Sequence, residues 1–442
     1  MQIIYSLLLS LAFAVLLPYF SYQAITRRKN FNNFRERMGS LPDYLKHDSR
    51  PAIWLHAVSV GEALAAVSLV RALEARFPGH RLIVSTTTAT GQRIAREKIK
   101  GAGGFCYFPF DWKFCVRRAL DTIRPQIVIL MESELWLNFL SECRRQAIPV
   151  VVANGRISDR SFARSRKFEF FTRRLYSLVS RFAMQSQTDA GRAVRLGADP
   201  QRVTVSGNLK YDIGQCAGSP EAKDAEANAG LFESIFALSS TPLIVAGSTS
   251  PGEEEIIIDS FRRLRTIDGL QSTRLLIAPR HPERFAEVAG LLDSLRVKYV
   301  RRSAFTGPGT TESRSADCIL LDSVGELAAL YRFASIVFIG GSLAPKGGHN
   351  ILEAAVYAKP IITGPHMENF REIKNEFIRR DALVQLCGDD PAVELSSVIS
   401  DLLTNRERAR IIGDNARRTV EENRGATART VELIVELIGP DR

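Results

Sequence analysis

Residues 336–366 read IVFIGGSLAPKGGHNILEAAVYAKPIITGPH and contain the clearest structural signal in the chain. The first four residues, Ile336–Ile339, are apolar and mostly β-branched, which is typical of a buried strand. The run breaks at Gly340-Gly341, and a loop leads through a second glycine pair to Asn350. An amphipathic segment, Ile351–Ala358, follows. The pattern predicts a strand, a glycine-rich loop and a helix that is capped by Asn350.

The glycine-rich loop also predicts a ligand. Glycines let a backbone approach a ligand closely, and the N–H groups of a helix start favour an anion. We therefore expect a phosphate-bearing ligand here, with Glu353 placed to accept hydrogen bonds from sugar hydroxyls. A tight turn without a ligand is the alternative, because glycine-rich loops are weak signals on their own.

The alternation of apolar runs and helical patterns extends over the chain in two series. The series occupy residues 50–212 and 241–425, and a polar, alanine-rich linker at residues 213–240 separates them. Such alternation implies right-handed crossovers and parallel sheets covered on both faces. We predict two Rossmann-like α/β domains with a cleft between the carboxyl edges of their sheets, where ligands of such sheets bind. A last helix, residues 426–442, is expected to pack back on the first domain.

The amino terminus carries a membrane signal. Residues 3–20 are almost wholly apolar and uncharged, which is near the lower length limit for spanning a bilayer. Five basic residues follow, at Arg27, Arg28, Lys29, Arg35 and Arg37. Residues 1–24 are therefore predicted to be an uncleaved anchor that spans the bilayer or lies in its interface, with the body of the protein on the cytoplasmic side. A buried core helix is the alternative.

The composition narrows the class of partner. A net charge of +11 suggests an acidic partner, namely nucleic acid, an anionic membrane surface or a phosphorylated substrate. Besides the anchor, one predicted helix carries much of the charge, at Arg160, Arg164, Arg166, Lys167, Arg173 and Arg174. Because no aromatic stacking platform is interleaved, a nucleic-acid binder is not expected. The cysteines and histidines, six of each, show neither C-x-x-C pairs nor metal-ligand spacing, which argues against a zinc site and a disulfide framework.

Acidic and basic side chains follow predicted strands of the first domain. Glu62 lies at a helix start and is a candidate to take a proton from an attacking hydroxyl. The helix dipole would lower its pKa, and a second carboxylate nearby would oppose that effect. Glu132 and Glu134 offer such a partner, although Glu134 is equally suited to cap a helix. Lys210 follows a glycine and suits a phosphate or a developing oxyanion; a solvated linker lysine is the alternative.

Polar groups also follow strands of the second domain. Pro279-Arg280 ends one strand, where prolines stiffen the turn and the guanidinium would hold a phosphate with two hydrogen bonds. Val324-Gly325-Glu326 and the loop through Asn350 to Glu353 complete the predicted rim.

Taken in order, these clusters resemble the 3-deoxy-D-manno-oct-2-ulosonic acid (Kdo) transferases of lipopolysaccharide synthesis, over nearly the whole chain. The motifs that carry the resemblance are His56–Glu62, Glu132–Trp136, Asn154–Ser158, Gly207–Lys210, Pro279–Phe285, Gly340–Leu343 and Gly347–Asn350. The chain departs from the family pattern at Leu137 and Ile351, where prolines are common.

The resemblance implies a GT-B glycosyltransferase that inverts at the anomeric carbon. It implies transfer of Kdo from CMP-Kdo to a phosphorylated lipid A precursor, with release of CMP, at the cytoplasmic face of the bacterial inner membrane. By the same resemblance Glu62 is the general base, and Glu132 and Lys210 support the transition state. The CMP moiety is expected to be held by Pro279, Arg280, Val324, Gly325, Glu326, Asn350, Ile351, Leu352 and Glu353.

Neither a metal nor another cofactor is expected, because the clusters contain no metal-binding aspartate pattern. The charge of the leaving group would then fall to Lys210, Arg280 and the helix start at Asn350. A transferase of the same architecture that uses a UDP-sugar and a lipid acceptor is the alternative enzyme. An anchored lipid-binding protein is the alternative without catalysis.

Overall fold

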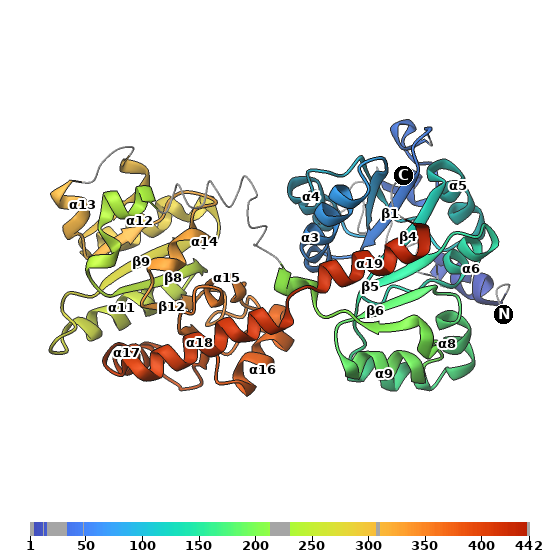
Figure 1. Ribbon diagram of the computed structural model, residues 1–442. Coiled ribbons are helices and arrows are strands. Elements are labelled where there is room, and N and C mark those ends of the chain that lie inside the picture. The colour runs from blue at the N-terminus through green and yellow to red at the C-terminus, as the bar shows by residue number, and fades with distance from the viewer. Residues whose placement is uncertain are drawn as a thin grey trace. The chain divides into compact units, whose positions relative to one another are not determined.

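The computed structural model describes residues 4–11, 13–15, 33–46, 48–212, 230–305 and 310–439. The chain divides into two compact units (Figure 1): unit 1 is Met1–Ile213 with Asn423–Arg442, and unit 2 is Gly214–Glu422. Each unit is built on a seven-stranded sheet whose paired strands run parallel. The prediction of two parallel-sheet α/β domains is confirmed.

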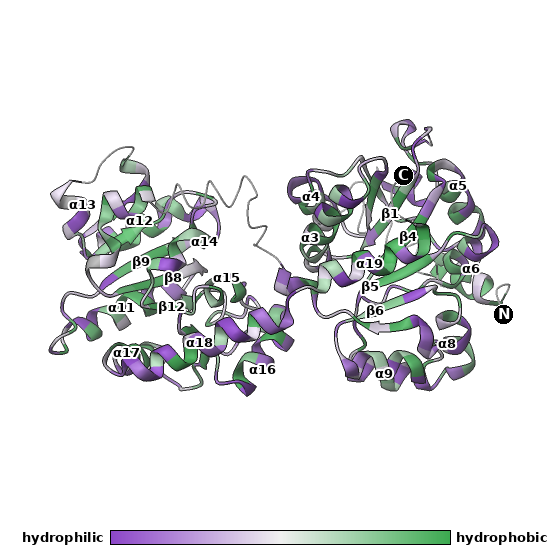
Figure 2. Cartoon of the chain, in the orientation of Figure 1, coloured by the Kyte–Doolittle hydropathy of each residue, from purple (hydrophilic) through white to green (hydrophobic). Residues whose placement is uncertain are grey.

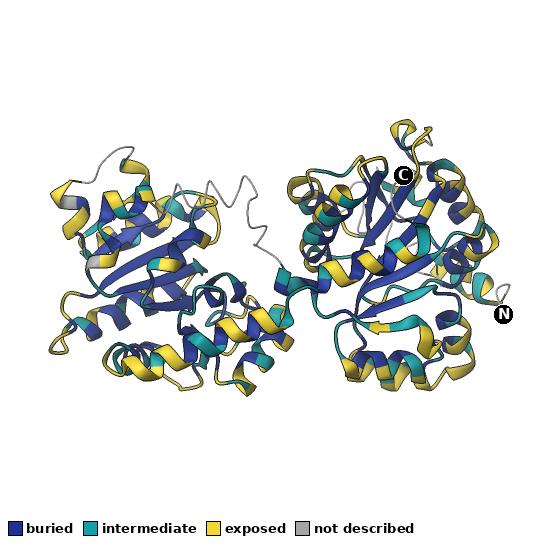
Figure 3. Cartoon of the chain, in the orientation of Figure 1, coloured by how far each residue is buried: buried dark blue, intermediate teal, exposed yellow. Residues whose placement is uncertain are grey.

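The sheet of unit 1 has the strand order β3-β2-β1-β4-β5-β6-β7. Its strands are β1 Ala52–Ala57, β2 Arg81–Thr86, β3 Gly104–Tyr107, β4 Pro125–Met131, β5 Val150–Gly155, β6 Arg181–Met184 and β7 Val203–Val205. The central strand β1 is buried at every residue, because helices cover both faces of the sheet (Figure 3). The chain adds β2 and β3 on one side of β1 and then returns to add β4 to β7 on its other side, so the strand order reverses between β1 and β4. Ligands of open parallel sheets bind at the carboxyl edge beside such a reversal.

Helices cover both faces of this sheet. They are α2 Phe34–Arg37, α3 Val60–Arg76, α4 Ala89–Lys98, α5 Lys113–Ile123, α6 Leu137–Arg145, α7 Asp159–Arg166, α8 Glu169–Tyr176, α9 Gln187–Arg195 and α19 Ala426–Ile438. Successive residues of a strand point to opposite faces, so Trp54 packs with Phe139 of α6, while Leu55 packs with Leu69 of α3. The strands are accordingly mostly apolar (Figure 2).

The last helix, α19, belongs to unit 1. The Asp212 carboxylate accepts hydrogen bonds from the N–H groups of Gly425 and Thr427, at 2.9 and 2.7 Å. These bonds satisfy free donors at the start of α19. Ile434 then packs in the same core cluster as Leu209.

The sheet of unit 2 has the order β10-β11-β9-β8-β12-β13-β14. Its strands are β8 Leu243–Thr249, β9 Arg274–Pro279, β10 Tyr299–Arg301, β11 Cys318–Leu320, β12 Ile336–Ile339, β13 Ile361–Thr363 and β14 Val384–Gln385. Its helices are α11 Glu253–Arg265, α12 Phe285–Ser294, α13 Thr311–Ser315, α14 Leu327–Leu330, α15 Leu352–Ala355, α16 Arg371–Arg379, α17 Pro391–Thr404 and α18 Arg406–Asn423. The strand β12 is buried at every residue, as its apolar run predicts.

Two local expectations differ from the structure. The helix expected at Ile351–Ala358 is the single turn α15, and Ile351 holds its N-cap position, although the Asn350 Oδ1 accepts the Leu352 N–H at 3.1 Å. The predicted linker lies outside the described residues at 213–229. Its remainder packs into unit 2, where Phe232 and Phe236 are fully buried. The polar, alanine-rich composition of the predicted linker did not indicate that these two phenylalanines belong to a core.

The described part of the amino-terminal segment, residues 4–11 and 13–15, is helical and packs on unit 1. Tyr5 stacks on Phe171 with 5.9 Å between ring centroids, and Phe13 and Trp112 form an edge-to-face pair with 4.9 Å between centroids. Within the described ranges no helix has both the length and the apolar content needed to cross a bilayer. The remaining positions of the predicted anchor lie outside the described residues.

Candidate active site

Glu62 lies in the first turn of α3, where the sequence Ser-Val-Gly-Glu forms a local cap. The Ser59 Oγ accepts the Glu62 N–H at 3.3 Å, and the Ser59 hydroxyl donates to the Glu62 Oε1 at 3.0 Å. The Val58 N–H donates to the Oε2 at 2.8 Å. This capping arrangement fixes the carboxylate over the helix start.

The environment of Glu62 suits proton transfer near neutral pH. Its side chain is only 8% exposed. Its pKa is raised to about 7, mainly by burial and in part by the charges of Glu132 and Glu134, while the hydrogen bonds from Val58 and Ser59 oppose the shift. The sequence predicts the repulsion between carboxylates, but burial is the larger cause. A carboxylate with this pKa is a competent general base at neutral pH.

Glu132 occupies a strained turn at the end of β4. Its φ is 58°, in the left-handed region that residues other than glycine rarely adopt, and its N–H donates to the Ala153 carbonyl at 2.9 Å. Such strain gathers at functional sites. Burial and the charge of Glu132 raise the pKa of Glu134. The helix α6 starts at Leu137, and its N-cap residue Trp136 makes no side-chain cap bond.

Lys210 lies in the 3-10 turn η4, Leu209–Asp212. The Leu209 N–H donates to the Asn154 Oδ1 at 3.0 Å, and the Lys210 N–H donates to the Asn208 Oδ1 at 3.0 Å. The turn packs against α3, the helix that carries Glu62. Lys210 is therefore half-buried and belongs to a packed turn of unit 1.

In unit 2, the glycine-rich loop after β12 already holds an anion. The Glu253 carboxylate accepts the N–H groups of Gly341, Ser342, Leu343 and Ala344, at 2.7, 2.9, 2.8 and 3.2 Å. Glu253 is 1% exposed. These four N–H groups are therefore not free to bind a phosphate, and the phosphate expected at the helix start near Asn350 stays a prediction. An internal carboxylate from the start of α11 takes the place of a phosphate.

A second group of polar side chains gathers beside this loop. Burial and the charges of Arg280 and His281 lower the pKa of His349 to about 4. Burial raises the pKa of Glu353, while the Asn350 side chain, 3.0 Å away, and the charge of Arg280 oppose the shift. The structure thus brings Arg280, after β9, together with His349, Asn350 and Glu353, after β12.

The third predicted segment of unit 2 lies one strand further out, after β11. Val324 is 75% exposed, and Gly325 has a φ of 91°. The Glu326 carboxylate accepts hydrogen bonds from the Ser323 hydroxyl and, at 3.0 Å, from the Arg302 guanidinium. Pro279 is buried at the end of β9, and Ile351 and Leu352 are buried in unit 2. These three therefore shape the backbone and offer no polar side chain.

Comparisons with known proteins identify the family. A family model described as "3-Deoxy-D-manno-octulosonic-acid transferase (kdotransferase)" matches residues 32–213. A 3-deoxy-D-manno-octulosonic acid transferase of Haemophilus influenzae is 32% identical over 409 residues, which cover 91% of each chain. The chain belongs to the 3-deoxy-D-manno-octulosonic acid transferase family. A second member, from Bordetella pertussis, is 32% identical over 88% of this chain and 87% of its own.

Solved structures agree with the fold of this family member. A UDP-GlcNAc 2-epimerase from Neisseria meningitidis matches with a TM-score of 0.56 at 12% identity, covering 87% of this chain and 100% of its own. A glycosyltransferase from Rickettsia africae matches with a TM-score of 0.51 at 14% identity, covering 88% and 99%. At such identities the likeness concerns the fold alone, which is GT-B.

Two residues of the Kdo transferase motifs were not predicted to have individual roles. His349 and Asn154 both lie inside quoted motifs, and position in the motif is the one signal that could have found them. Glu253 had no such signal, because acidic residues are common in the first turn of any helix. In the part of the chain that the structure describes, no group of histidine, cysteine and acidic side chains could hold a metal ion.

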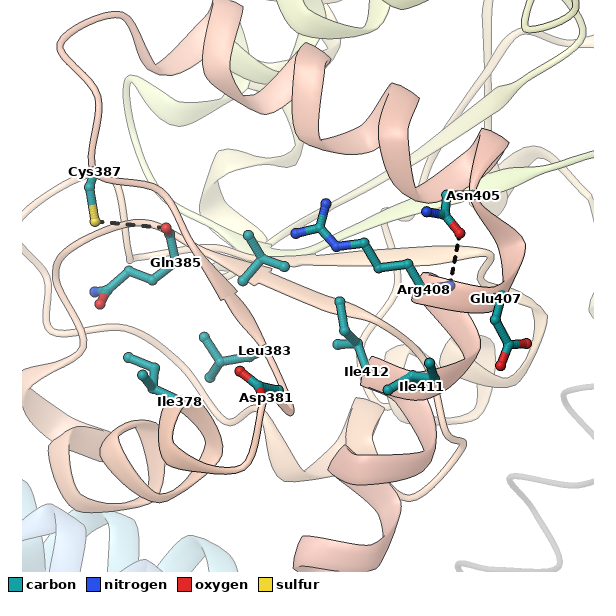
Figure 4. Close-up of a pocket in the computed structure, with 11 residues that line it drawn as sticks. Ile378, Asp381, Leu383, Gln385, Cys387, Asn405, Glu407, Arg408, Ile411 and Ile412 are labelled. Atoms are coloured by element: carbon teal, nitrogen blue, oxygen red, sulfur yellow. Dashed lines mark hydrogen bonds between the residues drawn. The ribbon is translucent and has the colours of Figure 1, made fainter.

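A pocket of about 750 Å³ lies elsewhere in unit 2, between α16, β14 and α18 (Figure 4). Ile378, Leu383 and Ile411 give it an apolar wall, and Arg408 reaches across it. None of the predicted site residues of this Kdo transferase family member lines the pocket. We therefore assign it no part in the candidate site.

Proposed function

We propose that the protein transfers Kdo from CMP-Kdo to a phosphorylated lipid A precursor and releases CMP. The observation that carries this proposal is the buried Glu62 carboxylate, with a pKa of about 7, beside Glu132 and Glu134 in a chain of the Kdo transferase family. The relatives from Haemophilus influenzae and Bordetella pertussis are named as transferases of this sugar.

In this proposal Glu62 acts as the general base. It accepts the proton of an acceptor hydroxyl while that oxygen bonds to the anomeric carbon of Kdo. The bond from this carbon to the phosphate oxygen breaks, and CMP leaves with the electron pair, which inverts the configuration. Glu132 stabilises the cationic sugar of the transition state, as carboxylates do in glycoside chemistry.

Positive charge on the phosphate completes the proposed chemistry. Lys210 and Arg280 supply it, because fixed cations stabilise charge that develops on a leaving group. Since Glu253 occupies the N–H groups of residues 341–344, the phosphate of CMP is assigned to Arg280 and not to that part of the loop. His349 is neutral at pH 7, as its lowered pKa requires, and therefore adds no charge of its own.

The remaining predicted residues of unit 2 are proposed to hold the nucleoside. Glu353 and Glu326 offer carboxylate oxygens to ribose or base donors, and Asn350 orients Glu353 through its 3.0 Å hydrogen bond. Pro279, Val324, Gly325, Ile351 and Leu352 shape the backbone around them.

We further propose that unit 1 docks peripherally on the anionic cytoplasmic face of the inner membrane. One face of the amino-terminal helical segment is exposed and apolar, at Ile4, Leu7, Leu8, Leu11 and Val15, each 61–69% exposed. The opposite face contacts α8 through Tyr5 and Phe171.

The turn between α7 and α8 also exposes apolar side chains, and basic residues surround them. Phe168 and Phe170 are 64% and 80% exposed. Six basic residues in and between these helices are also exposed, namely Arg160, Arg164, Arg166, Lys167, Arg173 and Arg174. Each basic residue near an anionic bilayer contributes about 1 kcal/mol of binding. Apolar residues rimmed by basic ones are typical of helices that lie in the membrane interface.

The proposed reaction is tested with CMP-Kdo, generated in place because it is labile, and a phosphorylated lipid A precursor. Mass analysis of the product should show the mass of Kdo added to the acceptor. Glu62→Gln should abolish transfer while CMP still protects the protein thermally, whereas Glu74→Gln, an exposed change on the same helix, should leave transfer intact. Thermal protection by UDP but not by CMP would favour the UDP-sugar alternative.

Membrane docking is tested by flotation with vesicles. The full chain should bind phosphatidylglycerol vesicles and not phosphatidylcholine vesicles, and Phe168→Ser with Phe170→Ser should weaken binding. The same variant should keep its activity on a detergent-dispersed acceptor. Equal flotation with both kinds of vesicle would contradict the electrostatic part of the proposal.

A further inference from the structure

Asn154 has a conformation that its strand does not require. It lies in β5, is fully buried and has a φ of 56°. The register of β5 against β6 shifts between Val152 and Gly155, which marks an irregularity at this residue. Left-handed conformations are strained for residues other than glycine, although asparagine tolerates them best. A feature of this kind persists only where the surrounding contacts hold it in place.

The contacts of Asn154 form a closed hydrogen-bond network around the turn that carries Lys210. The Asn154 Oδ1 accepts the Leu209 N–H at 3.0 Å, and its carbonyl accepts the Gln185 Nε2 at 3.0 Å. The Gln185 Oε1 accepts the Asn208 Nδ2 at 3.1 Å, and the Asn208 Oδ1 accepts the Lys210 N–H at 3.0 Å. Three amide side chains thus fix the backbone from residue 208 to residue 210.

The same point of β5 also fixes the turn of Glu132. The carbonyl of Ala153, next to Asn154 in the chain, accepts the Glu132 N–H at 2.9 Å. Two neighbouring residues of one strand therefore hold the backbone of Glu132 and that of Leu209, the residue before Lys210.

The orientation of the Asn154 amide follows from this network. Because its oxygen faces an N–H donor, its nitrogen must point elsewhere, and the Asn154 Nδ2 has no hydrogen-bond partner among the described residues. A buried donor without a partner costs about 1–3 kcal/mol. Because the unpaired amide nitrogen lowers stability, stability alone does not explain an asparagine at this position.

We infer that Asn154 is a positioning residue, which sets the place of Lys210 relative to Glu132 through the Leu209 backbone. This inference rests on the proposed function and adds to it the residue that aligns its cationic and anionic groups. Misplacement by about 1 Å of a group that must meet a transition state lowers the rate by about 100-fold.

Asn154→Gly is the discriminating variant, because glycine accepts the left-handed φ without strain and removes only the amide. We expect kcat to fall by about 10-fold or more, with little change in the KM for CMP-Kdo. Thermal stability should fall only modestly, because the loss of the acceptor for the buried Leu209 N–H is partly offset by removal of the unpaired Nδ2. Asn154→Asp keeps an acceptor for the Leu209 N–H and should therefore retain most of the wild-type kcat. Asp199→Gly, which removes a similar bond to the Gln201 N–H away from the site, is the control.

A double-mutant cycle with Lys210→Ala completes the test. If Asn154 acts through Lys210, Asn154→Gly should reduce kcat much less in the Lys210→Ala background than in the wild type. Additive losses, or a wild-type kcat in Asn154→Gly, would overturn the inference. A wild-type protein without Kdo transfer would instead refute the proposed function, so the two failures are distinguishable.

Discussion

The replacement of Glu62 by glutamine should make unit 1 more stable at alkaline pH while it removes catalysis. Burial raises the pKa of Glu62 from 4.5 to about 7. Between these two values the folded state holds the proton more tightly than the unfolded state, so stability falls as the pH rises. The full penalty, present above the folded pKa, is about 3 kcal/mol.

Glutamine does not ionise and therefore escapes this penalty. It should lose one hydrogen bond, at a cost of about 1 kcal/mol, because its amide nitrogen cannot accept and its single oxygen replaces only one of the two acceptors for the Val58 N–H and the Ser59 hydroxyl. That loss does not depend on pH, so a comparison between two pH values removes it. From about pH 5.5 to about pH 8.5, the stability of Glu62→Gln relative to wild type should rise by about 2 kcal/mol.

Tryptophan fluorescence during urea unfolding is the suitable assay. The chain has three tryptophans, Trp54, Trp112 and Trp136, and all lie in unit 1. Their emission therefore follows unit 1 without interference from unit 2. Activity should fall by about 100-fold to 10,000-fold, the usual effect of losing a general base. The wild-type kcat/KM should rise with pH through about 7, and the variant should lack this rise.

One result would refute the reasoning. If Glu62→Gln changed the stability of unit 1 by the same amount at both pH values, the carboxylate would not carry a raised pKa in the folded state. The exposed Glu74→Gln should show that pH-independent behaviour, and it calibrates the measurement.

Three further predictions concern unit 2 and cofactors. Glu253→Ala should destabilise unit 2 by about 3 kcal/mol or more in thermal unfolding, because four loop N–H groups lose their buried acceptor, whereas the exposed Glu255→Ala should not. Arg280→Ala should weaken CMP binding in calorimetry by about 10-fold, the typical effect of losing a charge-assisted hydrogen bond to phosphate, and Arg296→Ala should leave binding unchanged. Treatment with a chelator should leave Kdo transfer unchanged; dependence on an added divalent cation would contradict the proposed chemistry.

Much of the fold follows from patterns that are local in the chain. The apolar run Ile336–Ile339 predicts a buried strand, and the structure buries all four residues as β12. The repeated alternation predicts two parallel-sheet domains, because a strand covered on both faces has to be apolar throughout. The positions of Glu62 and Glu132 at strand ends also follow from the sequence, since polar residues directly after a buried run mark the edge of a sheet.

The tertiary structure alone decided the properties that depend on distant neighbours. From the sequence we expected the helix dipole to lower the pKa of Glu62 and a second carboxylate to raise it. In the structure, burial is the main cause of its raised pKa. The N–H groups that follow the glycine pair after β12 bind Glu253, which lies 88 positions earlier than Gly341, and no local pattern predicts that contact. Phe232 and Phe236 looked like linker residues and are core. Periodicity records which face of an element is apolar, whereas burial and hydrogen-bond partners depend on segments that meet only when the chain folds.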